Sequence, residues 1–304
     1  MADTNISVRH LFTMRLNRLH GDSHDFMGPF GRRIFERPRG GSIEGAEIQG
    51  EVLDLLATDY GNASSDGTLR QIDANIVAQT HDGVIIYMKV RGRASPAYGP
   101  GQSRISLLFT VAEGAYEDLN NIPAVGIGRD EGDDTVYEIY ALTGEPEGAE
   151  VSDEGLPPCE RKTLPATYLF TRKSAHTPGS TRHKIQGPLG GRYMTLAESG
   201  GKFEGPRLEG KFLSGYSWSP HYTGMLGDVE IMHYDVKTLL QTDDGVPILM
   251  SYFGTKPANY TGTYMTATVF ETPEGDYDWL NQVQAVGAGR WMGDGAQYTV
   301  YALA

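Results

Sequence analysis

The sequence predicts an all-β protein made of two tandem antiparallel β-barrels that are related by an internal duplication. Three observations lead to this prediction. The chain repeats itself once over nearly its whole length, its apolar residues alternate with a period of two, and its 39 glycines and 17 tyrosines favour strands and turns over helices. Closing an antiparallel sheet into a barrel removes its free edges and leaves an interior cavity, so we expect one barrel from each copy.

The duplication is first visible in a pentapeptide. QTHDG at 79–83 returns as QTDDG at 241–245, and the agreement extends outward on both sides. The other matching segments are LFT at 11–13 and 169–171, GPFGRR at 28–33 and GPLGGR at 187–192, GGSIEGAEIQGEVL at 40–53 and GGKFEGPRLEGKFL at 200–213, AEGAYEDLNNIPAVGIGR at 112–129 and PEGDYDWLNQVQAVGAGR at 273–290, and VYEIYAL at 136–142 and QYTVYAL at 297–303. A repeat of this length indicates two whole domains and not a solenoid.

The repeat sets the expected domains. We expect a first barrel over residues 1–142, a linker over 143–165 and a second barrel over 166–304. The linker is rich in proline, glycine and acidic residues and cannot bury an apolar face. It holds Cys159, the single cysteine, for which we expect an exposed and unreactive thiol. Two similar barrels can pack as a pseudo-dimer, so we expect a monomer or a weak homo-oligomer.

Within each copy, the apolar pattern is that of strands. In residues 85–91, Tyr87 and Arg91 share one face and apolar side chains share the other. Residues 71–79 likewise place Asp73 on one face and an apolar series on the opposite face. We expect seven or eight strands in each copy and no amphipathic helix.

The repeated pentapeptide lies between two of these strands. Its Asp82-Gly83 step predicts a tight hairpin in which Gly83 adopts a positive φ, and Asp244-Gly245 predicts the same turn in the second copy. The motif is therefore explained by turn chemistry and need not be catalytic.

Charge and hydropathy exclude several classes of partner. The formal net charge of −13 disfavours nucleic acids and anionic membranes, because phosphate binding needs a basic face. The chain has no uninterrupted apolar run of about 18 residues, and its first residues do not resemble a secretory signal. We therefore expect a cytoplasmic protein without a nucleic-acid or membrane partner.

The common cofactor and nucleophile motifs are incomplete. The string GYSWS at 215–219 lacks the last glycine of a nucleophile elbow. In GIGRDEG at 126–132 and GAGRWMG at 287–293, the third glycine comes one residue late for a dinucleotide-binding loop. These glycines are better explained by backbone that packs closely in a barrel. We expect no cofactor.

Histidine and aspartate also gather near the start of the chain. His20 and His24, with Asp22 and Asp25, could approach a metal, but a solvated polar loop explains them better. His176 and His183 receive the same interpretation. We expect no metal site.

Read in order, the motifs carry a family resemblance. GGSIEG and IQGEVL, then Asp59-Tyr60, then DGTLRQIDANIVAQTHDGVIIYMKVRG, and finally YDWLN, VGAGR and VYAL resemble a family of small β-barrel proteins catalogued as domain of unknown function three-two-three-seven. The resemblance covers nearly all of both copies. It implies a lipocalin-like barrel and a role in small-molecule metabolism, but it does not fix a reaction. The second copy departs from the pattern, with Ser217-Trp218 in place of the family's Asp-Trp and Phe253-Gly254-Thr255 in place of Arg-Gly-Arg.

Polar residues within apolar strands are the candidate catalytic groups. Asp73 and Asp235 occupy matching positions, and Asp235 is followed two residues later by Lys237 on the same strand face. If that face points into the barrel, a poorly hydrated carboxyl could exchange protons near neutral pH, with Lys237 as donor or electrostatic stabiliser. The same face could equally point outward, or the two residues could form a structural ion pair. His221 and the family-like Asp59 are further candidates.

Aromatic residues and one arginine are the candidate substrate-binding groups. They could line a ligand cavity, although aromatic side chains in strands also serve simply as core. This set comprises Tyr60, Tyr87, Arg91, Trp218, Tyr252 and Trp279.

Three functions fit the sequence. The first is a cofactor-independent isomerase, cyclase or lyase of small-molecule (secondary) metabolism that acts on a hydrophobic aromatic or terpenoid-like substrate, including pericyclase-like cyclisation. The second is a non-catalytic carrier of a small hydrophobic molecule. The third is a structural protein with solid barrels. We favour the first, with the second barrel as the active one because it pairs Asp235 with Lys237; the cleft between the barrels is the competing location.

Overall fold

The computed structural model describes residues 4–18, 22–28, 31–144, 161–176, 182–187, 190–196, 198–226, 228–257, 262–292 and 295–304. These residues divide into two compact units, one over Val8–Leu142 and one over Thr163–Ala304, and residues 4–7 cluster with the latter. We call the two units the first barrel and the second barrel. Most of the expected linker, including Cys159, lies outside the described residues.

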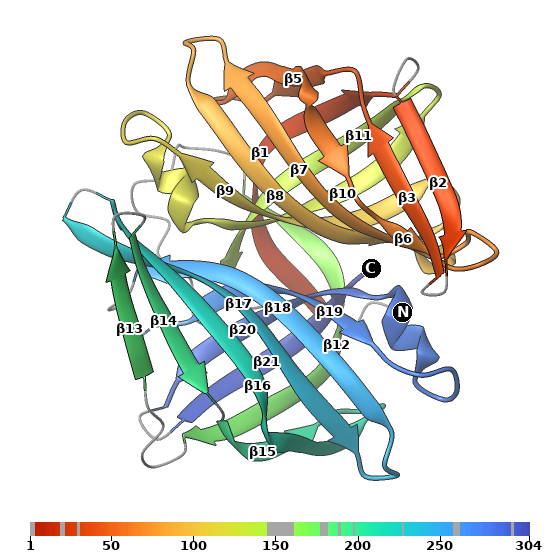
Figure 1. The fold of residues 1–304 in the computed structure, drawn as a ribbon, viewed down its shortest axis with the longest axis vertical. Helices are drawn as coiled ribbons and strands as arrows, with labels where there is room; N and C mark the ends of the chain where they lie inside the picture. The colour runs from red at the N-terminus through yellow and green to blue at the C-terminus, as the bar shows by residue number, and fades with distance from the viewer. Residues whose placement is uncertain are drawn as a thin grey trace. The chain divides into compact units, whose positions relative to one another are not determined.

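The first barrel is a ring of eight strands in the part of the chain that the structure describes (Figure 1). Neighbouring strands pair in an antiparallel manner around the ring, and a pairing between its first and last strands closes it. In ring order the strands are β1 (Thr4–Asn17), β4 (Gly41–Glu44), β5 (Gln49–Asp59), β7 (Arg70–Thr80), β8 (Ile85–Ala94), β9 (Gln102–Val111), β10 (Pro123–Glu131) and β11 (Asp134–Gly144).

A hairpin stands beside this ring. It consists of β2 (Asp22–Gly28) and β3 (Gly31–Arg37), and β3 pairs with β5 and with the short β6 (Asn62–Ala63). The expectation of a solvated polar loop at residues 20–25 is therefore wrong for the described part, because these backbone groups pair with β3. His24 is exposed there, Asp25 forms an ion pair of 2.6 Å with Arg32, and His20 lies outside the described residues.

The second barrel closes in the same way, again within the described residues (Figure 1). The hairpin of β13 (Arg182–Gly187) and β14 (Gly190–Leu196) pairs with its long strand β16. His176 ends β12 and His183 lies in β13, and neither side chain is among those described. The strands of the ring are β12 (Arg161–His176), β15 (Glu198–Glu204), β16 (Glu209–Leu226), β17 (Val229–Thr242), β18 (Pro247–Pro257), β19 (Tyr264–Glu271), β20 (Gln284–Trp291) and β21 (Gly295–Leu303).

Strand alternation fills each interior. On β7, Ile72, Ala74 and Ile76 are buried in the core of the first barrel while the residues between them are only half-buried. On β17, Tyr234 and Val236 belong to the core of the second barrel. This period of two is what the sequence predicts for strands with one apolar face. The described helices are three short 3-10 turns, η1 (Pro96–Tyr98), η2 (Glu117–Asn121) and η3 (Asp278–Gln282), and none of them is long enough to cross a membrane.

The two pentapeptides form the expected hairpin turns. Gly83 has a φ of 89° and Gly245 a φ of 92°, so both predictions of positive φ are confirmed. In each turn a tyrosine hydroxyl donates a hydrogen bond of 3.2 Å to the turn aspartate, from Tyr116 to Asp82 and from Tyr277 to Asp244. The motif is thus preserved by local turn structure in both copies.

The paired glycines of β10 and β20 also have the expected structural role. A Cβ atom on Gly128 would lie 2.3 Å from the Ser103 Oγ and 2.4 Å from the ring of Tyr137. On Gly289 it would lie 2.6 Å from the ring of Tyr298. Since such contacts are too short for any real Cβ, these glycines make room for the tyrosines beside them.

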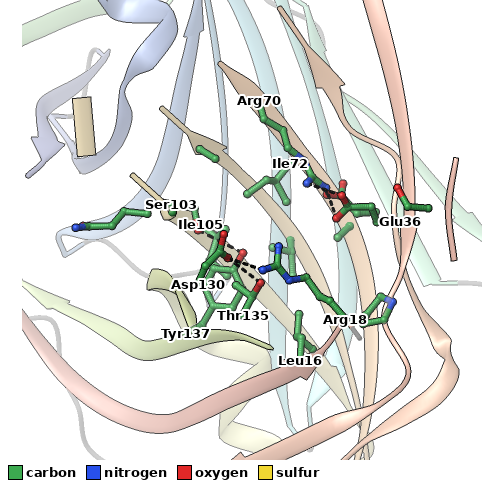
Figure 2. A pocket seen from close by; sticks show the side chains of 18 of the residues that line it. Leu16, Arg18, Glu36, Arg70, Ile72, Ser103, Ile105, Asp130, Thr135 and Tyr137 are labelled. Atoms are coloured by element: carbon green, nitrogen blue, oxygen red, sulfur yellow. Dashed lines mark hydrogen bonds and ion pairs between the residues drawn. The ribbon is translucent and has the colours of Figure 1, made fainter. Parts of the chain in front are cut away.

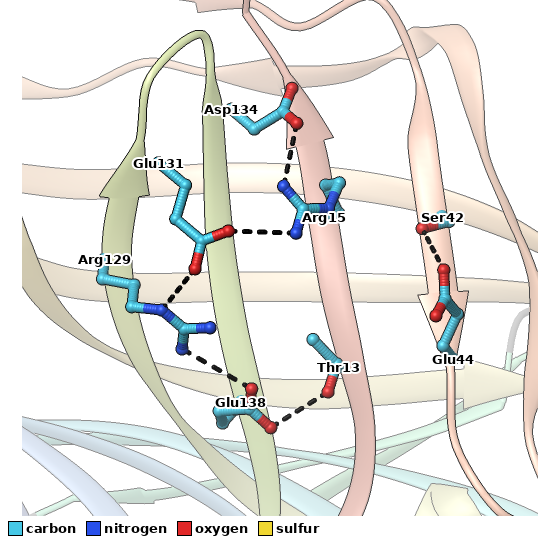
Figure 3. Close-up of polar contacts among 8 residues, drawn as sticks. All are labelled: Thr13, Arg15, Ser42, Glu44, Arg129, Glu131, Asp134 and Glu138. Carbon is cyan, nitrogen blue, oxygen red and sulfur yellow. Dashed lines mark hydrogen bonds and ion pairs between the residues drawn. The ribbon is translucent and has the colours of Figure 1, made fainter.

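A polar network covers the outer face where the first ring closes (Figure 3). Arg15 of β1 forms ion pairs of 2.9 Å with Asp134 and 3.0 Å with Glu131, and Glu131 also contacts Arg129 at 2.6 Å. Hydrogen bonds from Arg129 and then Arg15 lower the pKa of the Glu131 carboxyl. The network joins β1 to β10 and β11 from outside and leaves the interior to apolar packing.

Candidate functional site

The interior of the first barrel holds a cavity of about 710 Å³. This volume lies within the range of small-molecule sites, which is roughly 300–1,000 Å³. Much of the wall is apolar and comes from the inward faces of the barrel strands: Ala57, Ile72, Ala74, Ile76, Val90 and Ile105. The lining also holds polar groups, and those labelled in Figure 2 include Arg70 and Glu36 on one side and Ser103 and Tyr137 on the other.

The first polar part is built around Asp59 at the end of β5. Its Oδ2 accepts a hydrogen bond of 2.5 Å from the Arg70 Nη2, and its Oδ1 accepts one of 3.0 Å from the Asp73 backbone N–H. Arg70 also binds Glu36 through two hydrogen bonds, Nη1 to Oε1 at 2.9 Å and Nη2 to Oε2 at 2.8 Å. The Asp59 side chain is only 12% exposed. One guanidinium is therefore shared by two carboxylates at the edge of the cavity.

This sharing controls the protonation of Asp59. Burial raises the pKa of the Asp59 carboxyl; the charge of Arg70 and the Asp73 N–H oppose the rise, and the charge of Glu36 adds to it. Burial alone would lower the pKa of Arg70, but its hydrogen bonds to Glu36 and the charge of Asp59 outweigh this and raise it. Arg70 thus stays cationic, while the Asp59 carboxyl holds its proton to a higher pH than an exposed aspartate does.

The second polar part lies across the cavity and consists of Ser103 on β9 and Tyr137 on β11. In Figure 2 these residues and Ile105 occupy one side, and Arg70, Ile72 and Glu36 occupy the other. The Ser103 hydroxyl donates a long hydrogen bond of 3.4 Å to the Tyr137 Oη. Burial raises the pKa of the Tyr137 phenol, which keeps it a neutral donor at physiological pH.

The mouth carries an exposed ion pair. Arg18 lies 3.2 Å from the Asp130 Oδ1, which also accepts a hydrogen bond of 3.1 Å from Thr135. All three residues line the cavity, together with the loop that contains η1. These charges lie at the entrance, and the apolar wall lies behind them.

The second barrel has a different interior. Tyr234, Tyr252, Tyr298 and Tyr264 are all buried, and their rings contact one another in a closed cycle with centroid separations of 6.5, 5.5, 5.5 and 5.8 Å. The hydroxyls of Tyr264 and Tyr298 are hydrogen-bonded to each other. We call these four residues the tyrosine cycle. Edge-on and tilted contacts of this kind are favourable arrangements of aromatic rings.

A buried arginine packs against the tyrosine cycle. Arg172 has no exposed surface and donates a hydrogen bond of 2.9 Å to the Tyr252 Oη. Its guanidinium lies 4.2 Å from the ring centre of Tyr298 and 4.7 Å from that of Phe212. Cation–π contacts of this kind partly replace the water that the charge has lost.

The predicted second-barrel residues do not come together in the interior. Lys237 is exposed, and Asp235 shares its strand face, which is opposite to the face of the core residues Tyr234 and Val236. The inward orientation that the predicted proton transfer requires is absent for this pair. His221 is partly buried, with its ring 6.0 Å from that of Tyr234.

The strand register also corrects one part of the sequence matching. In the second barrel, Trp218 pairs with Lys237. Lys237 matches Asn75 of the first barrel, and Asn75 pairs with Thr58. Trp218 therefore corresponds to Thr58 and not to Tyr60. The register shifts that precede this point in β5 and β16 are equal, so they do not alter the match. The Trp218 side chain lies outside the described residues.

The remaining predicted residues are spread over both barrels. Asp59 lines the cavity and Tyr252 belongs to the tyrosine cycle, whereas Asp73 and Arg91, which pair across β7 and β8, and Tyr87 lie on the face opposite to the core. Tyr87 donates a hydrogen bond of 2.5 Å to Asn75 on that outer face. Tyr60 is 48% exposed and contacts Phe35. Trp279 lies in η3, under the guanidinium of Arg207 at 3.8 Å.

Sequence reasoning missed Arg70, Glu36, Ser103 and Tyr137 in the first barrel. The signal for Arg70 was present, since it precedes Ile72 by two residues and shares the apolar face of β7. The signal for Tyr137 was also present, because it lies in the repeated segment at 136–142 and shares its strand face with the apolar Ile139. Among the described residues, no group of three His, Cys, Asp or Glu side chains is arranged to hold a metal ion.

Comparison with known proteins identifies the repeat. The model of a protein family of unknown function, DUF3237, matches residues 6–142 and again residues 167–303. The chain belongs to this family as a tandem duplication, which confirms the resemblance seen in the sequence. A comparison with curated proteins found no significant match.

Several solved structures are similar to this chain over about half of its length. A β-barrel-like protein from Acinetobacter baumannii has 23% identity and a TM-score of 0.41, and the match covers 50% of this chain and 100% of that protein. A conserved protein of unknown function from Rhodopseudomonas palustris has 20% identity and a TM-score of 0.40, with 45% and 97% covered. A protein described as an enzyme, from Penicillium herquei, has 20% identity and a TM-score of 0.36, with 49% and 99% covered. At these identities the similarity concerns the barrel fold alone.

Proposed function

We propose that this two-barrel member of the DUF3237 family is a cofactor-independent isomerase or cyclase whose active site is the cavity of the first barrel. The observation that carries the proposal is the Asp59 carboxyl, which lies at the cavity edge and shares Arg70 with Glu36. Asp59 is the proton-transferring group. This location differs from the second-barrel site that the sequence favoured.

The apolar wall supports a small hydrophobic substrate. Aliphatic side chains of Ile72, Ile76, Val90 and Ile105 would surround an aromatic or alicyclic body and exclude water from it. Binding in a shaped cavity fixes the reacting atom close to the carboxyl, which lowers the entropic part of the barrier.

The electrostatics of the cluster suit both directions of proton transfer. When Asp59 is protonated, Arg70 keeps a complete two-bond ion pair with Glu36. When Asp59 is ionised, the Arg70 Nη2 and the Asp73 N–H stabilise its charge. Because neither state leaves Arg70 without an anion, Asp59 can donate a proton and recover it without a cofactor.

Deuterium exchange tests the proposal. We would incubate the protein with 2-tetralone, an apolar bicyclic ketone, in D₂O and follow loss of the proton signals next to its carbonyl by NMR. Asp59→Asn should slow the catalysed exchange by about 10²–10⁴-fold, the usual contribution of a general acid or base. Asp54→Asn is the matched control, because Asp54 is an exposed carboxylate on the same strand.

Two results would contradict the proposal. Wild-type exchange no faster than in buffer, together with tight binding of the ketone, would favour a carrier of small hydrophobic molecules. Equal exchange by Asp59→Asn and wild type would remove Asp59 from the chemistry.

A further inference from the structure

The tyrosine opposite Asp59 has a hydroxyl proton that no described residue accepts. The Tyr137 Oη receives the 3.4 Å hydrogen bond from Ser103, and no acceptor for its own O–H lies among the described residues. The matching tyrosine of the second barrel, Tyr298, is hydrogen-bonded to Tyr264 instead. The first barrel places the small Ser103 where the second places Tyr264, and the Tyr137 side chain lines the cavity.

The backbone around this tyrosine is built to hold it in place. Gly128 of β10 pairs with Ser103 on one side and with Tyr137 on the other. Any side chain at residue 128 would collide with both, as the 2.3 Å and 2.4 Å distances from a Cβ show. The phenol is therefore fixed in the wall by its neighbours, which is the preorganisation that stabilisation of a developing charge requires.

The charges of the opposite wall act on the same hydroxyl. Burial raises the pKa of the Tyr137 phenol, and the hydrogen bond from Ser103 lowers it. The charge of Arg70 also lowers this pKa, and the charge of Asp59 raises it. Figure 2 shows Tyr137 on one side of the cavity and Arg70 on the other. A molecule between them would meet the Tyr137 O–H on one side and, on the other, the Asp59 carboxyl that is bonded to Arg70.

We infer that Tyr137 is a catalytic residue that binds the oxygen of the substrate, and that the substrate is an enolisable carbonyl compound with an apolar body. This inference rests on the function proposed above. The Asp59 carboxylate removes a proton from the carbon next to the carbonyl, and the electron pair moves to the carbonyl oxygen. The Tyr137 O–H donates a hydrogen bond to the resulting enolate.

The reaction closes without another reactant. In a substrate that carries a C=C bond beside the acidic carbon, Asp59 returns its proton to the far carbon of that bond. The electron pair on oxygen re-forms the C=O bond, the C=C bond moves next to the carbonyl, and the product is an isomer of the substrate. Atoms and electrons balance, and no oxidant or reductant takes part. The apolar body of the substrate remains against the aliphatic wall throughout.

Binding of 2-naphthol tests the inference independently of turnover, because this apolar phenol imitates the enol. Wild-type protein should bind 2-naphthol more tightly than naphthalene, and Tyr137→Phe should weaken 2-naphthol binding roughly fivefold or more while leaving naphthalene unchanged. Tyr298→Phe is the matched control in the second barrel and should leave both dissociation constants unchanged. In the 2-tetralone exchange assay, Tyr137→Phe should lower kcat more than it raises KM.

The outcomes separate the two proposals. Equal 2-naphthol affinity in wild type and Tyr137→Phe, or equal affinity of the wild type for 2-naphthol and naphthalene, overturns the role of Tyr137. Circular dichroism of the variant and its unchanged binding of naphthalene exclude misfolding as the cause of a loss. Failure of the proposed function would instead appear as undiminished exchange by Asp59→Asn.

Discussion

The two barrels share a fold but use their interiors in opposite ways. At four matching positions, the first barrel has Met14, Ile72, Val90 and Ser103, where the second has Arg172, Tyr234, Tyr252 and Tyr264. Three of the residues in the first barrel line its cavity, and all four in the second are buried among one another. The difference shows that the barrel itself does not determine a ligand site; a few inward side chains do.

The shared residues make this comparison sharp. Tyr137 and Tyr298 match, and so do the glycines beside them, Gly128 and Gly289. The hydroxyl partner of the tyrosine changes from Ser103 to Tyr264. The tyrosine cycle fills the interior of the second barrel, whereas the space beside Tyr137 in the first barrel is part of the cavity in which we propose the active site.

The largest expected effect comes from filling the first barrel in the manner of the second. Val90→Tyr combined with Ser103→Tyr should place two rings in the cavity and weaken 2-naphthol binding by about 100-fold or more, because the occupied volume excludes the ligand. Fluorescence titration measures the affinity, and circular dichroism checks the fold. Thr110→Tyr, which adds a ring at an exposed position of β9, is the control. Unchanged binding by the double variant would show that the ligand site lies elsewhere.

A second prediction compares loss of packing at one matched position. Tyr234→Ile removes a buried ring that contacts Tyr252 and Tyr264, and we expect it to lower the free energy of unfolding by about 2–4 kcal/mol. Ile72→Val, at the match of Tyr234 beside the cavity, should cost only about 0.5–1.5 kcal/mol. Denaturant unfolding measures both values. Similar costs would mean that the tyrosine cycle is no more tightly packed than the cavity wall.

Much of the fold could be predicted from the sequence, because duplication, period-two alternation and turn residues are local signals. The active face could not. Alternation shows that Asp73 and Asn75 share a face and that Arg70 and Ile72 share the other, but not which face is inside. On β7, the candidate predicted from the sequence was Asp73, which lies on the outer face. Arg70, two residues before the apolar series that starts at Ile72, lies on the face that lines the cavity. A partly buried ion pair with Glu36 and Asp59 explains how an arginine can occupy that face.

Asp59 was predicted, but its partners and its barrel were not. The register of β5 against β7 shifts between Val52 and Ala57, shortly before Asp59. The residue that pairs with Asp59 therefore could not be found by counting along the sequence. Glu36 lies in β3 of the β2–β3 hairpin. The sequence predicted a loop at residues 20–25 and no such hairpin. The cluster forms because three separate strands meet, and such long-range proximity leaves no trace in a single sequence.

A third prediction concerns the pH dependence of the first barrel. The pKa of Asp59 is raised by burial, so the folded state holds this proton more strongly than the unfolded state does. Stability contributed by the protonated form should therefore be lost as pH rises from the unfolded pKa of an aspartate to the raised folded pKa, with a slope of at most about 1.4 kcal/mol per pH unit. Asp59→Asn should flatten this slope.

The control for the pH prediction has the opposite sign. The hydrogen bond from Thr80 lowers the pKa of Asp82, so this group contributes stability above the unfolded pKa and loses it as pH falls. Asp82→Asn should remove stability at neutral pH and leave the Asp59-dependent slope in place. Denaturant unfolding at a series of pH values measures both, and an Asp59→Asn profile parallel to wild type would count against a raised pKa.

The smallest difference is expected at the repeated turns, where the barrels should behave alike. Gly83 and Gly245 have φ values of 89° and 92°, and a Cβ on either would meet nothing within 4 Å. The cost of Gly83→Ala and of Gly245→Ala is therefore backbone strain alone, about 1–2 kcal/mol each. Because the strain is a property of the turn and not of the barrel interior, the two costs should agree within about 0.5 kcal/mol, as measured by denaturant unfolding. A clearly larger cost in the first barrel would mean that the turn also supports the cavity, and the pentapeptide would then be preserved for more than the hairpin.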